Sequence, residues 1–343
     1  MNDKLREHRD SPSKGRIISK VGIVIANTGS PEAPTSEAVA RYLRLFLSDP
    51  LICPMNPHVW SFVLDHFIIP QRAPASAAKY ASIWIEEGSP LDAYMASLAK
   101  KLRESLQDHG VACVLHASSY SSPSLKDALG ECKELGCDQV IVVPLYPQSA
   151  FSTTSAVRRK VDEALTDLAW NGKLRFVESY CDEDAYIDAI AASVRASDFD
   201  TREGDRLLFA FHSIPVADIR AGDTYGEQTQ RTAQKVARKL SIREGEWRIG
   251  YQCRFDKSRK WLGPFTAPVL QELSDAKRLF VVAPNFSVDC LETLFDIQCE
   301  LREKWQDVKA MRDAKDKKGR EEANAAEVAG GTFRYIPCLN DSD

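Results

Sequence analysis

The stretch LFVVAPNFSVDCLETLFDI, residues 279–297, joins an apolar strand to a helix with an acidic side. In an α-helix, the intervals of three, four and four residues between successive carboxylates would place all of them on one face. Adjacent carboxylates repel one another unless water or a cation lies along their face. The stretch therefore predicts a helix face suited to a divalent metal, although its first two carboxylates also fit the N-cap and capping box of an ordinary helix. The four residues are Asp289, Glu292, Asp296 and Glu300.

A second apolar strand also ends at a residue that can bind metal. LLFAFHSIP, residues 207–215, is apolar up to His212 and then turns into a proline and a polar loop. Ligands of open parallel sheets collect outside the carboxyl ends of the strands, where this imidazole would lie. A single histidine in such a place is more often a hydrogen-bonded structural residue. His212 and Glu292, on two strand ends of one sheet, could nevertheless converge on a single cleft.

The composition is that of an ordinary globular enzyme. The chain of 343 residues is long enough for two domains, and its net charge is -4 with a pI of about 6.0. This charge balance does not predict nucleic-acid binding. The nine cysteines form no C-x-x-C pair, which indicates reduced thiols in a cytoplasmic protein.

The start of the chain is not predicted to target the protein to a membrane. Residues 1–20 are polar and of mixed charge, so we interpret them as a disordered tail and not as a signal peptide. No apolar run reaches the roughly 18 residues that a membrane span needs.

Apolar runs alternate with amphipathic segments along the rest of the chain, which predicts α/β architecture with parallel sheets flanked by helices. An Asn-Gly turn at residues 170–173 suggests a boundary between a domain of residues 21–170 and a domain of residues 171–343. The second domain carries His212 and Glu292. Strands are expected at residues 21–26, 111–118, 139–144, 174–180, 206–211, 247–251, 278–282 and 331–336. Helices are expected at residues 36–47, 75–85, 91–106, 124–135, 155–168, 184–196, 224–240, 265–273 and 290–305.

Two segments interrupt this alternation. Residues 304–327 are rich in Lys, Asp, Glu and Ala, and predict an extended solvated helix with an exposed charged loop. Residues 57–70, PHVWSFVLDHFIIP, are aromatic and apolar. They fit either a buried helix or an exposed apolar lip for a flat hydrophobic ligand or a membrane surface.

Six ordered blocks, which span most of residues 21–340, give the chain a resemblance to a known family. The blocks are ANTGSPEAPTSEAVARYLRLFLSDP (26–50), YASIWIEEGSPL (80–91), VVPLYPQSAFSTTSAV (142–157), FHSIP with GDTYGEQ (211–228), YQCRF with WLGPFT (251–266) and APNFSVDCLETL (283–294). Together they resemble the signature blocks of ferrochelatase. The resemblance implies two similar Rossmann-like domains (the chelatase fold) with the active site in the cleft between them. It also implies insertion of Fe2+ into protoporphyrin IX, the terminal step of haem biosynthesis, with Fe2+ as a substrate and no permanently bound cofactor.

The resemblance also assigns roles to residues. His212 matches the essential histidine, and its neutral imidazole suits a base or a metal contact. Glu292 matches the acidic partner that would hold iron or relay protons, and Asp289, Asp296 and Glu300 would conduct cations along the helix. The open coordination positions left by two protein ligands would let the metal be handed on. The candidates for porphyrin contact, each of which has an ordinary structural reading as well, are Trp261, Tyr120, Tyr80, Arg72, Phe151, Ser152, Thr153 and Thr154.

Several positions depart from the family pattern. Ser119 stands where an arginine is common, Ser149 replaces a tyrosine, and Asn285 replaces a glycine. The loop before Trp261 is one residue longer than usual and carries Asp256. Some relatives hold a [2Fe-2S] cluster on cysteines of a C-terminal extension; we expect no iron-sulfur cluster here, because Cys338 alone cannot replace that extension.

Two rival functions remain open. A sister enzyme inserts iron into coproporphyrin III, whose four propionates need more cations around the cleft, and Ser119 disfavours it slightly. Alternatively, the protein is a non-catalytic porphyrin- or haem-binding module, which the intact His212 and Glu292 disfavour. The sequence predicts a cytoplasmic enzyme with peripheral membrane contact through residues 57–70 as an option, and it does not predict the oligomeric state.

Overall fold

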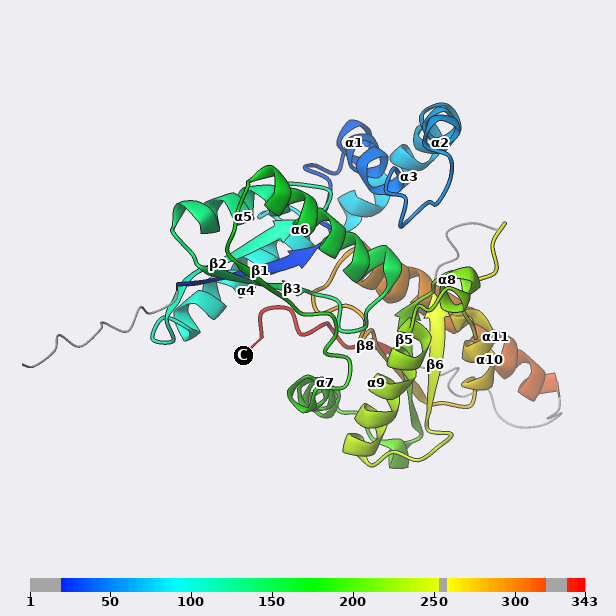
Figure 1. Cartoon of the computed structure of the whole chain (residues 1–343). Coiled ribbons are helices and arrows are strands. Elements are labelled where there is room, and N and C mark those ends of the chain that lie inside the picture. The colour runs from blue at the N-terminus through cyan, green and yellow to red at the C-terminus, as the bar shows by residue number, and fades with distance from the viewer. Residues whose placement is uncertain (1–19, 253–257, 319–331, 343) are drawn as a thin grey trace, which may run out of the picture.

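The computed structural model describes residues 20–252, 258–318 and 332–342, and contains two four-stranded sheets in which every strand pair is parallel (Figure 1). The α/β architecture predicted from the alternation is confirmed. The first sheet has the order β2-β1-β3-β4, with β1 (Val21–Asn27), β2 (Val111–Ser118), β3 (Gln139–Pro144) and β4 (Lys173–Phe176). The second has the order β6-β5-β7-β8, with β5 (Asp205–His212), β6 (Trp247–Gln252), β7 (Arg278–Val282) and β8 (Thr332–Tyr335).

Helices cover both faces of each sheet. On the first sheet, α5 and α6 contribute to one buried apolar cluster and α4 to another. On the second, α7 and α9 pack with one face and α10 and α11 with the other. These helices are α4 (Pro90–Ser105), α5 (Leu125–Glu134), α6 (Ala156–Asp167), α7 (Asp184–Ala196), α9 (Tyr225–Leu240), α10 (Thr266–Glu272) and α11 (Arg302–Lys318).

Three further helices stand outside the first sheet and hold a separate buried cluster, as the upper part of Figure 1 shows. They are α1 (Ser36–Leu47), α2 (Pro57–Val63) and α3 (Ile69–Ile83). The short elements are α8 (Val216–Arg220), the 3-10 helix η3 (Thr201–Glu203) and the π-helices η1 (Leu64–Ile68), η2 (Phe151–Ser155) and η4 (Glu292–Leu301).

The expected position of the strand after the Asn-Gly turn is wrong. We placed residues 174–180 in the second half, but β4 pairs in parallel with β3 and completes the first sheet. The chain passes to the second half only after β4, since α7 packs with β5. An Asn-Gly turn marks a reversal of the chain, and a reversal inside one sheet gives the same signal as a domain boundary.

The two halves are tied together by segments that cross between them. Val288 and Cys290, which follow β7 of the second sheet, are buried in the cluster that Ile25 and Met95 form in the first half. Near the C-terminus, Asp341 accepts a hydrogen bond from the Ser97 hydroxyl of α4. The connection after β7 is therefore part of the first half's core.

Residues 57–70 form α2, η1 and the start of α3, and they are mostly exposed. Leu64 and Ile69 are buried, but Val59, Phe62 and Phe67 are 55 to 58% exposed. The buried-helix reading is therefore wrong for the outward side of the segment, because only one row of its side chains faces α1 and α3. The exposed apolar lip matches the second reading, and its contact with a membrane stays a prediction.

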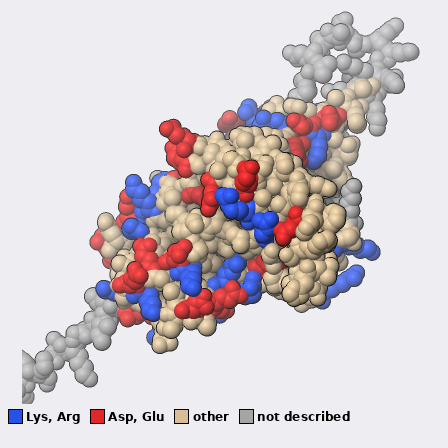
Figure 2. Space-filling view, turned by 90° about the horizontal axis from the view of Figure 1, so that it is seen from above, with Lys and Arg blue, Asp and Glu red and all other residues tan. Residues whose placement is uncertain are grey.

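The surface and the remaining segments add little to the site. Acidic and basic side chains are intermixed on the face shown in Figure 2, as the small net charge predicts. Within the described ranges, no helix is both long enough and apolar enough to cross a bilayer.

The predicted charged helix at residues 304–327 is α11 as far as Lys318, with Trp305 fully buried. Residues 1–19 and 319–331, which include the expected tail and charged loop, lie outside the described residues.

Candidate active site

A large cavity opens at the carboxyl ends of the strands. It encloses about 1190 Å³ of empty space, with the open solvent at its mouth included. Strand ends supply Asn27 from β1 and His212 from β5, and α1 and α3 supply a wall of larger side chains. The lining residues are Asn27, Thr28, Gly29, Ser30, Tyr42, Leu43, Phe46, Ser76, Tyr80, Leu91, Tyr146, Gln148, Ala150, Ser152, Thr153, His212, Ile214, Tyr225, Asn285, Phe286, Cys290, Leu291 and Glu292.

His212 is the last residue of β5 and is held in one orientation. Its Nδ1 lies 2.7 Å from the Ser213 carbonyl oxygen, which can only accept, so Nδ1 carries the proton of the neutral ring. The lone pair then belongs to Nε2, the nitrogen suited to take a proton or bind a metal. The backbone is fixed as well, because the Tyr225 hydroxyl donates to the His212 carbonyl oxygen at 2.9 Å. The half-buried ring lines the cavity with its basic nitrogen defined.

Glu292 lines the same cavity from the start of η4, ten residues after β7 ends. The residues before it, Val288 and Cys290, are anchored in the first half, so the chain brings Glu292 back toward the cleft. After burial, the Glu292 carboxylate is the next largest cause of the raised pKa of Tyr42. The Glu292 carboxylate thus acts inside a cavity that six Phe and Tyr side chains line.

Asp289 does not share the acidic face. Its buried carboxylate accepts hydrogen bonds from the hydroxyls of Thr293 and Tyr335 and from the Asn340 amide, and it belongs to the structure before the helix. The capping box of Asp289 and Glu292 is absent too, because the N-cap position of η4 is Leu291, without a side-chain cap. The expected single α-helix over residues 290–305 is instead π-helix η4, which begins at Glu292, followed by α11.

Asp296 and Glu300 do face one side of η4, and a lysine lies between them. Lys79 of α3 contacts Asp296 Oδ1 at 3.0 Å and Glu300 Oε1 at 2.8 Å. Burial and then Glu292 raise the pKa of Asp296, whereas Lys79 lowers it. The carboxylates of Glu292, Asp296 and Glu300 therefore extend from the cavity toward the surface, and the ammonium group of Lys79 lies beside the outer two. Whether metal ions follow this row stays a prediction.

The loop after β1 forms part of the cavity floor and depends on a glycine. Gly29 has a φ of +89°, and a Cβ there would lie 2.0 Å from Ser121 Oγ and 2.7 Å from Ser118 Cβ. Any side chain at this position would collide with the loop after β2. Asn27 holds the same loop by accepting hydrogen bonds from the Thr28 backbone and the Tyr146 hydroxyl.

Four tyrosines give the cavity rigid walls that stay neutral. Burial is the largest cause of a raised pKa at each of them, so none ionises near physiological pH. Tyr42 also donates its hydroxyl to the Gly29 carbonyl oxygen at 2.9 Å, which joins α1 to the loop after β1. The four residues are Tyr42, Tyr80, Tyr146 and Tyr225.

The predicted porphyrin contacts divide into two groups. Tyr80, Ser152 and Thr153 line the cavity. The other five predicted side chains, Tyr120, Phe151, Thr154, Arg72 and Trp261, are absent from its lining.

Most of this second group has another place in the fold. Tyr120 was predicted to contact the porphyrin, but it packs edge-on against Phe46 and donates its hydroxyl to Asp49 at 2.8 Å. Thr154 is fully buried. Trp261 pairs through its backbone with Pro215, next to the lining residue Ile214.

Sequence reasoning singled out few of the polar and aromatic residues that line the cavity. Tyr42, Phe46, Tyr146 and Gln148 all lie within the quoted blocks but were not assigned roles. The signal that could have found them was position, because each block follows a strand end or forms the helix beside it. Ser119, which stands where an arginine is common in the family, is not a lining residue.

Solved structures with the same arrangement define the class of fold. SirB from Bacillus subtilis with Fe3+ is 12% identical, with a TM-score of 0.52 over 93% of this chain and 89% of that one. DR2241 from Deinococcus radiodurans, described as structurally similar to chelatases, is 12% identical with a TM-score of 0.51 over 94% of this chain and 52% of that one. The molecule therefore has the two-domain chelatase fold.

Sequence comparison identifies the family within that class. A sequence model of the ferrochelatase family matches residues 20–343. Curated ferrochelatases from Nitrosococcus oceani and Janthinobacterium sp. are each 36% identical over 94% of this chain and 83% of their own length. One from Herminiimonas arsenicoxydans is 36% identical over 98% of this chain and 86% of its own. The chain belongs to the ferrochelatase family, whose activity is the insertion of iron into a porphyrin.

Proposed function

We propose that the protein is a protoporphyrin ferrochelatase, a lyase that inserts Fe2+ into protoporphyrin IX to give protohaem and two protons. The observation that carries this proposal is that His212, at the end of β5, and Glu292, at the start of η4, line one cavity together with aromatic side chains. Nothing in the sequence required the His212 and Glu292 side chains to face the same cavity. Because they do, one bound ring would have both a base and a carboxylate within the same cavity.

In this proposal His212 is the catalytic base. Nε2 takes up the pyrrole protons in turn and releases them, since its partner nitrogen is held by the Ser213 carbonyl. Glu292 holds the incoming Fe2+ or accepts a proton, and Asp296 and Glu300 deliver the cation from outside. Two protein ligands leave the iron free to exchange its remaining ligands for ring nitrogens.

The walls of the cavity would hold and bend the ring. Tyr42, Phe46 and Tyr80 come from α1 and α3, so a rigid layer of aromatic side chains can press on one side of a flat ligand. Because the buried hydroxyl of Tyr42 is already bonded to Gly29, this wall is fixed before the ligand enters. A bent ring points its nitrogen lone pairs to one face, where the metal must bind.

Charge at the cavity favours protoporphyrin IX over coproporphyrin III. Among the described residues that line the cavity there is neither lysine nor arginine, and Glu292 is acidic. A ring with four propionates would place more negative charge there without a cation to balance it. Two propionates can lie at the rim, near Ser76, Ser152 and Arg72. Arg72 is one turn from Ser76 on α3, on the same side of the helix.

The exposed lip of α2 and η1 is our candidate for peripheral contact with a membrane surface. Its outward side chains are apolar, and protoporphyrin is poorly soluble in water.

The test is haem formation from protoporphyrin IX and Fe2+ under anaerobic conditions, followed by the absorption of the metallated ring. The native chain should turn over, and it should prefer protoporphyrin IX to coproporphyrin III. His212→Ala should bind porphyrin with a similar Kd but lose at least about a hundredfold in kcat, the size of a general-base contribution. Glu292→Gln should show a comparable loss together with a higher KM for Fe2+.

Two controls make the result decisive. His116→Ala removes a histidine that does not line the cavity, and it should keep its turnover. Porphyrin binding by the native chain without any haem would support a binding module instead. Retained turnover in His212→Ala would show that the base lies elsewhere.

A further inference from the structure

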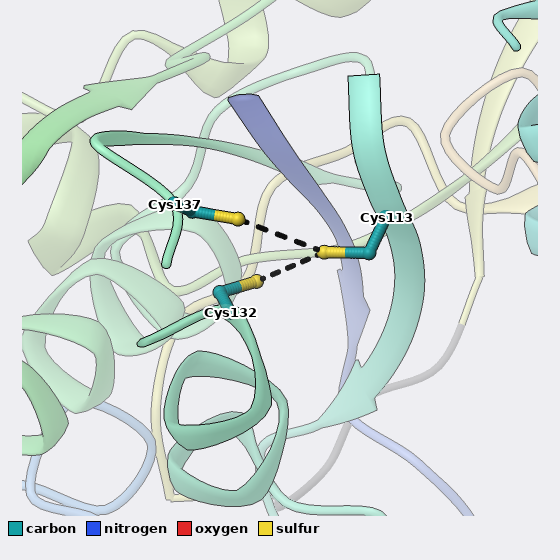
Figure 3. Close-up of side chains that lie close together, drawn as sticks. All are labelled: Cys113, Cys132 and Cys137. Carbon is teal, nitrogen blue, oxygen red and sulfur yellow. Dashed lines mark hydrogen bonds between the residues drawn. The ribbon is translucent and has the colours of Figure 1, made fainter. Parts of the chain in front are cut away.

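Three cysteine thiols meet at the end of the first sheet opposite the cavity (Figure 3). Cys113 lies near the start of β2, Cys132 lies in α5, and Cys137 lies two residues before β3. Cys113 Sγ is 3.6 Å from Cys132 Sγ and 4.0 Å from Cys137 Sγ, and all three sulfurs lie within 4.8 Å of one another. In sequence Cys132 and Cys137 are five residues apart and Cys113 precedes Cys132 by 19 residues, so the fold brings Cys113 to the other two.

The cluster is separate from the porphyrin cavity. Gly22, whose backbone lies beside the sulfurs, is the second residue of β1, whereas the cavity begins at Asn27, the last residue of the same strand. At about 3.3 Å per residue, five residues of strand separate the two places by roughly 16 Å. No thiol of the cluster lines the cavity.

Gly22 leaves a space between the sulfurs. A Cβ at this position would lie 2.8 Å from Cys132 Sγ and 3.3 Å from the sulfurs of Cys113 and Cys137. One point next to the backbone is thus almost equally distant from all three sulfurs. Two sides of the sulfur triangle are 3.6 and 4.0 Å and the third is at most 4.8 Å, so the point equidistant from the three sulfurs lies about 2.0–2.5 Å from each, close to the ~2.3 Å of a Zn–S bond.

The surroundings favour a soft ligand. The three residues are buried in an apolar cluster that includes Leu129 and Val140, and the thiols contact one another. Hydrogen bonds from Cys132 and then Cys137 lower the pKa of Cys113 to about 7, because a thiolate there is held by two S–H donors. Burial raises the pKa of Cys137 to about 11.

We propose that Cys113, Cys132 and Cys137 form a three-sulfur site for a thiophilic metal ion of the Cu+, Zn2+ or Cd2+ kind. Thiolate ligands select such ions over hard cations, which prefer oxygen. Binding forms three metal–sulfur bonds, releases the thiol protons to solvent and involves no change of oxidation state. Because the ligands come from β2, α5 and the connection to β3, a bound ion would join three elements of the first half. It would stabilise the fold by mass action.

Cd2+ is the probe for the test, because its thiolate complexes absorb in the ultraviolet and ligation by histidine or carboxylate does not give this band. The reduced, metal-free full chain should bind one Cd2+ with this absorption and unfold at a higher temperature. Its affinity should fall as the pH is lowered, since protons compete for the sulfurs. Cys113→Ser and Cys132→Ser should each weaken binding at least tenfold, and Cys181→Ser and Cys299→Ser should leave it unchanged.

Gly22→Ala separates the geometry of the site from the presence of the thiols. This variant keeps every cysteine but fills the space between the sulfurs with a methyl group, so the Cd2+ band should weaken as much as in Cys113→Ser. All variants should keep haem formation, because the cluster is remote from His212. The proposal and the assignment of the cavity can therefore fail independently.

X-ray absorption of the Zn2+-loaded native chain needs no variant. We expect a first shell with three sulfur atoms at about 2.3 Å. A shell of nitrogen and oxygen only would place the ion elsewhere and overturn the proposal. An unchanged Cd2+ band in both Cys113→Ser and Gly22→Ala would overturn it as well, as would the absence of any thiolate band in the reduced native chain, which would mean three packed thiols and no site.

Discussion

Asp92 and Asp127 occupy the same position in two helices and have opposite electrostatic surroundings. Each is the third residue of its helix, in α4 and α5. Asp127 accepts hydrogen bonds from the backbone and hydroxyl of Ser124, which lower its pKa. Asp92 lacks such a cap, because Ser89 makes no side-chain cap bond, and burial raises the pKa of Asp92 to about 7.

These two shifts predict opposite dependences of stability on pH. Folded Asp92 keeps a proton that the unfolded chain loses above pH 3.8, so its contribution to stability falls as the pH rises from 3.8 to about 7. Asp92→Asn should therefore raise the free energy of unfolding near pH 8. We expect about 1–2 kcal/mol, less than the full shift implies because Asp92 is partly exposed. Near pH 4 the variant and the native chain should be alike.

Asp127→Asn is the matched control for this measurement. The lowered pKa of Asp127 contributes stability above its ordinary value, and this is lost as the pH falls through the folded pKa. The variant should therefore be less stable than the native chain near pH 8 and equal to it in acid. Urea unfolding at several pH values compares the two. A loss of stability near pH 8 in Asp92→Asn would contradict the burial argument.

At the scale of single residues, the sequence predicted chemistry better than contacts. His212 and Glu292 could be singled out because each follows an apolar strand and is of a type that binds metal or protons. Tyr120 could not be separated from Phe46, since both are aromatic residues of the first half and only packing decides which of them reaches the cavity. Cys113, Cys132 and Cys137 gave no signal, because their proximity arises from three different elements.

At the scale of elements, η4 decides how the acidic residues are presented. The carboxylate intervals predicted one α-helical face, but a π-helix begins at Glu292 and leaves Asp289 outside. Sequence periodicity cannot distinguish these helices over ten residues, because the apolar pattern fits both. π-helical segments are rare and are frequent at functional sites. Two of them, η2 and η4, carry residues that line the cavity.

Lys79 provides a test of the proposed cation path along η4. It balances Asp296 and Glu300, so a metal ion that follows these carboxylates must compete with its ammonium group. Lys79→Met should lower the KM for Fe2+ by roughly threefold to tenfold, as expected for a partly exposed charge pair. The kcat should change little, because Lys79 does not line the cavity. Steady-state rates at varied Fe2+ measure both quantities.

Lys304→Met is the control for general surface charge. Lys304 lies 4.0 Å from Glu300 and is more exposed than Lys79. Lys304→Met changes the net charge by the same amount as Lys79→Met, but it leaves the ion pair between Lys79 and Asp296 in place. If the two substitutions change the KM for Fe2+ equally, or if Lys79→Met does not change it, Asp296 and Glu300 do not take part in the delivery of iron.

At the scale of the whole molecule, the fold followed from the alternation of strands and helices, and the order of the strands did not. The repeat of a strand and a helix requires parallel pairing, because each helical connection returns the chain to the end of the sheet at which the previous strand began. It does not say where one sheet ends. β4 pairs with the free edge of β3 and so completes the first sheet. A strand of four residues is too short for its sequence to indicate which strand it pairs with.

Asn340 provides a test of how the chain end supports the site. Its side chain donates to Asp289 and accepts from the Asp289 backbone, and its φ of +53° lies in the left-handed region that asparagine tolerates. Asn340→Ala should lower the free energy of unfolding by about 1–3 kcal/mol, because the buried Asp289 carboxylate loses a donor. Turnover should fall as well, since the segment after Asp289 carries Glu292.

Asn340→Gly separates the amide from the backbone. Glycine adopts a positive φ without strain, so this variant should recover the part of the loss that comes from conformation and keep the part that comes from the missing donor. Urea unfolding measures both variants. Full native stability in Asn340→Ala would show that Asp289 does not depend on this amide.

The burial of Val288 and Cys290 in the opposite half limits how the molecule can admit a ligand. A wide swing of one half away from the other would pull these side chains out of an apolar core and carry Glu292 away from His212. The helices α1 and α3 are held by their own small core, by the Tyr42 hydroxyl, and by Lys79, which bonds to Asp296 and Glu300 of η4. A flat guest should thus enter and leave through the open mouth of the cavity, while His212 and Glu292 keep their places from one turnover to the next.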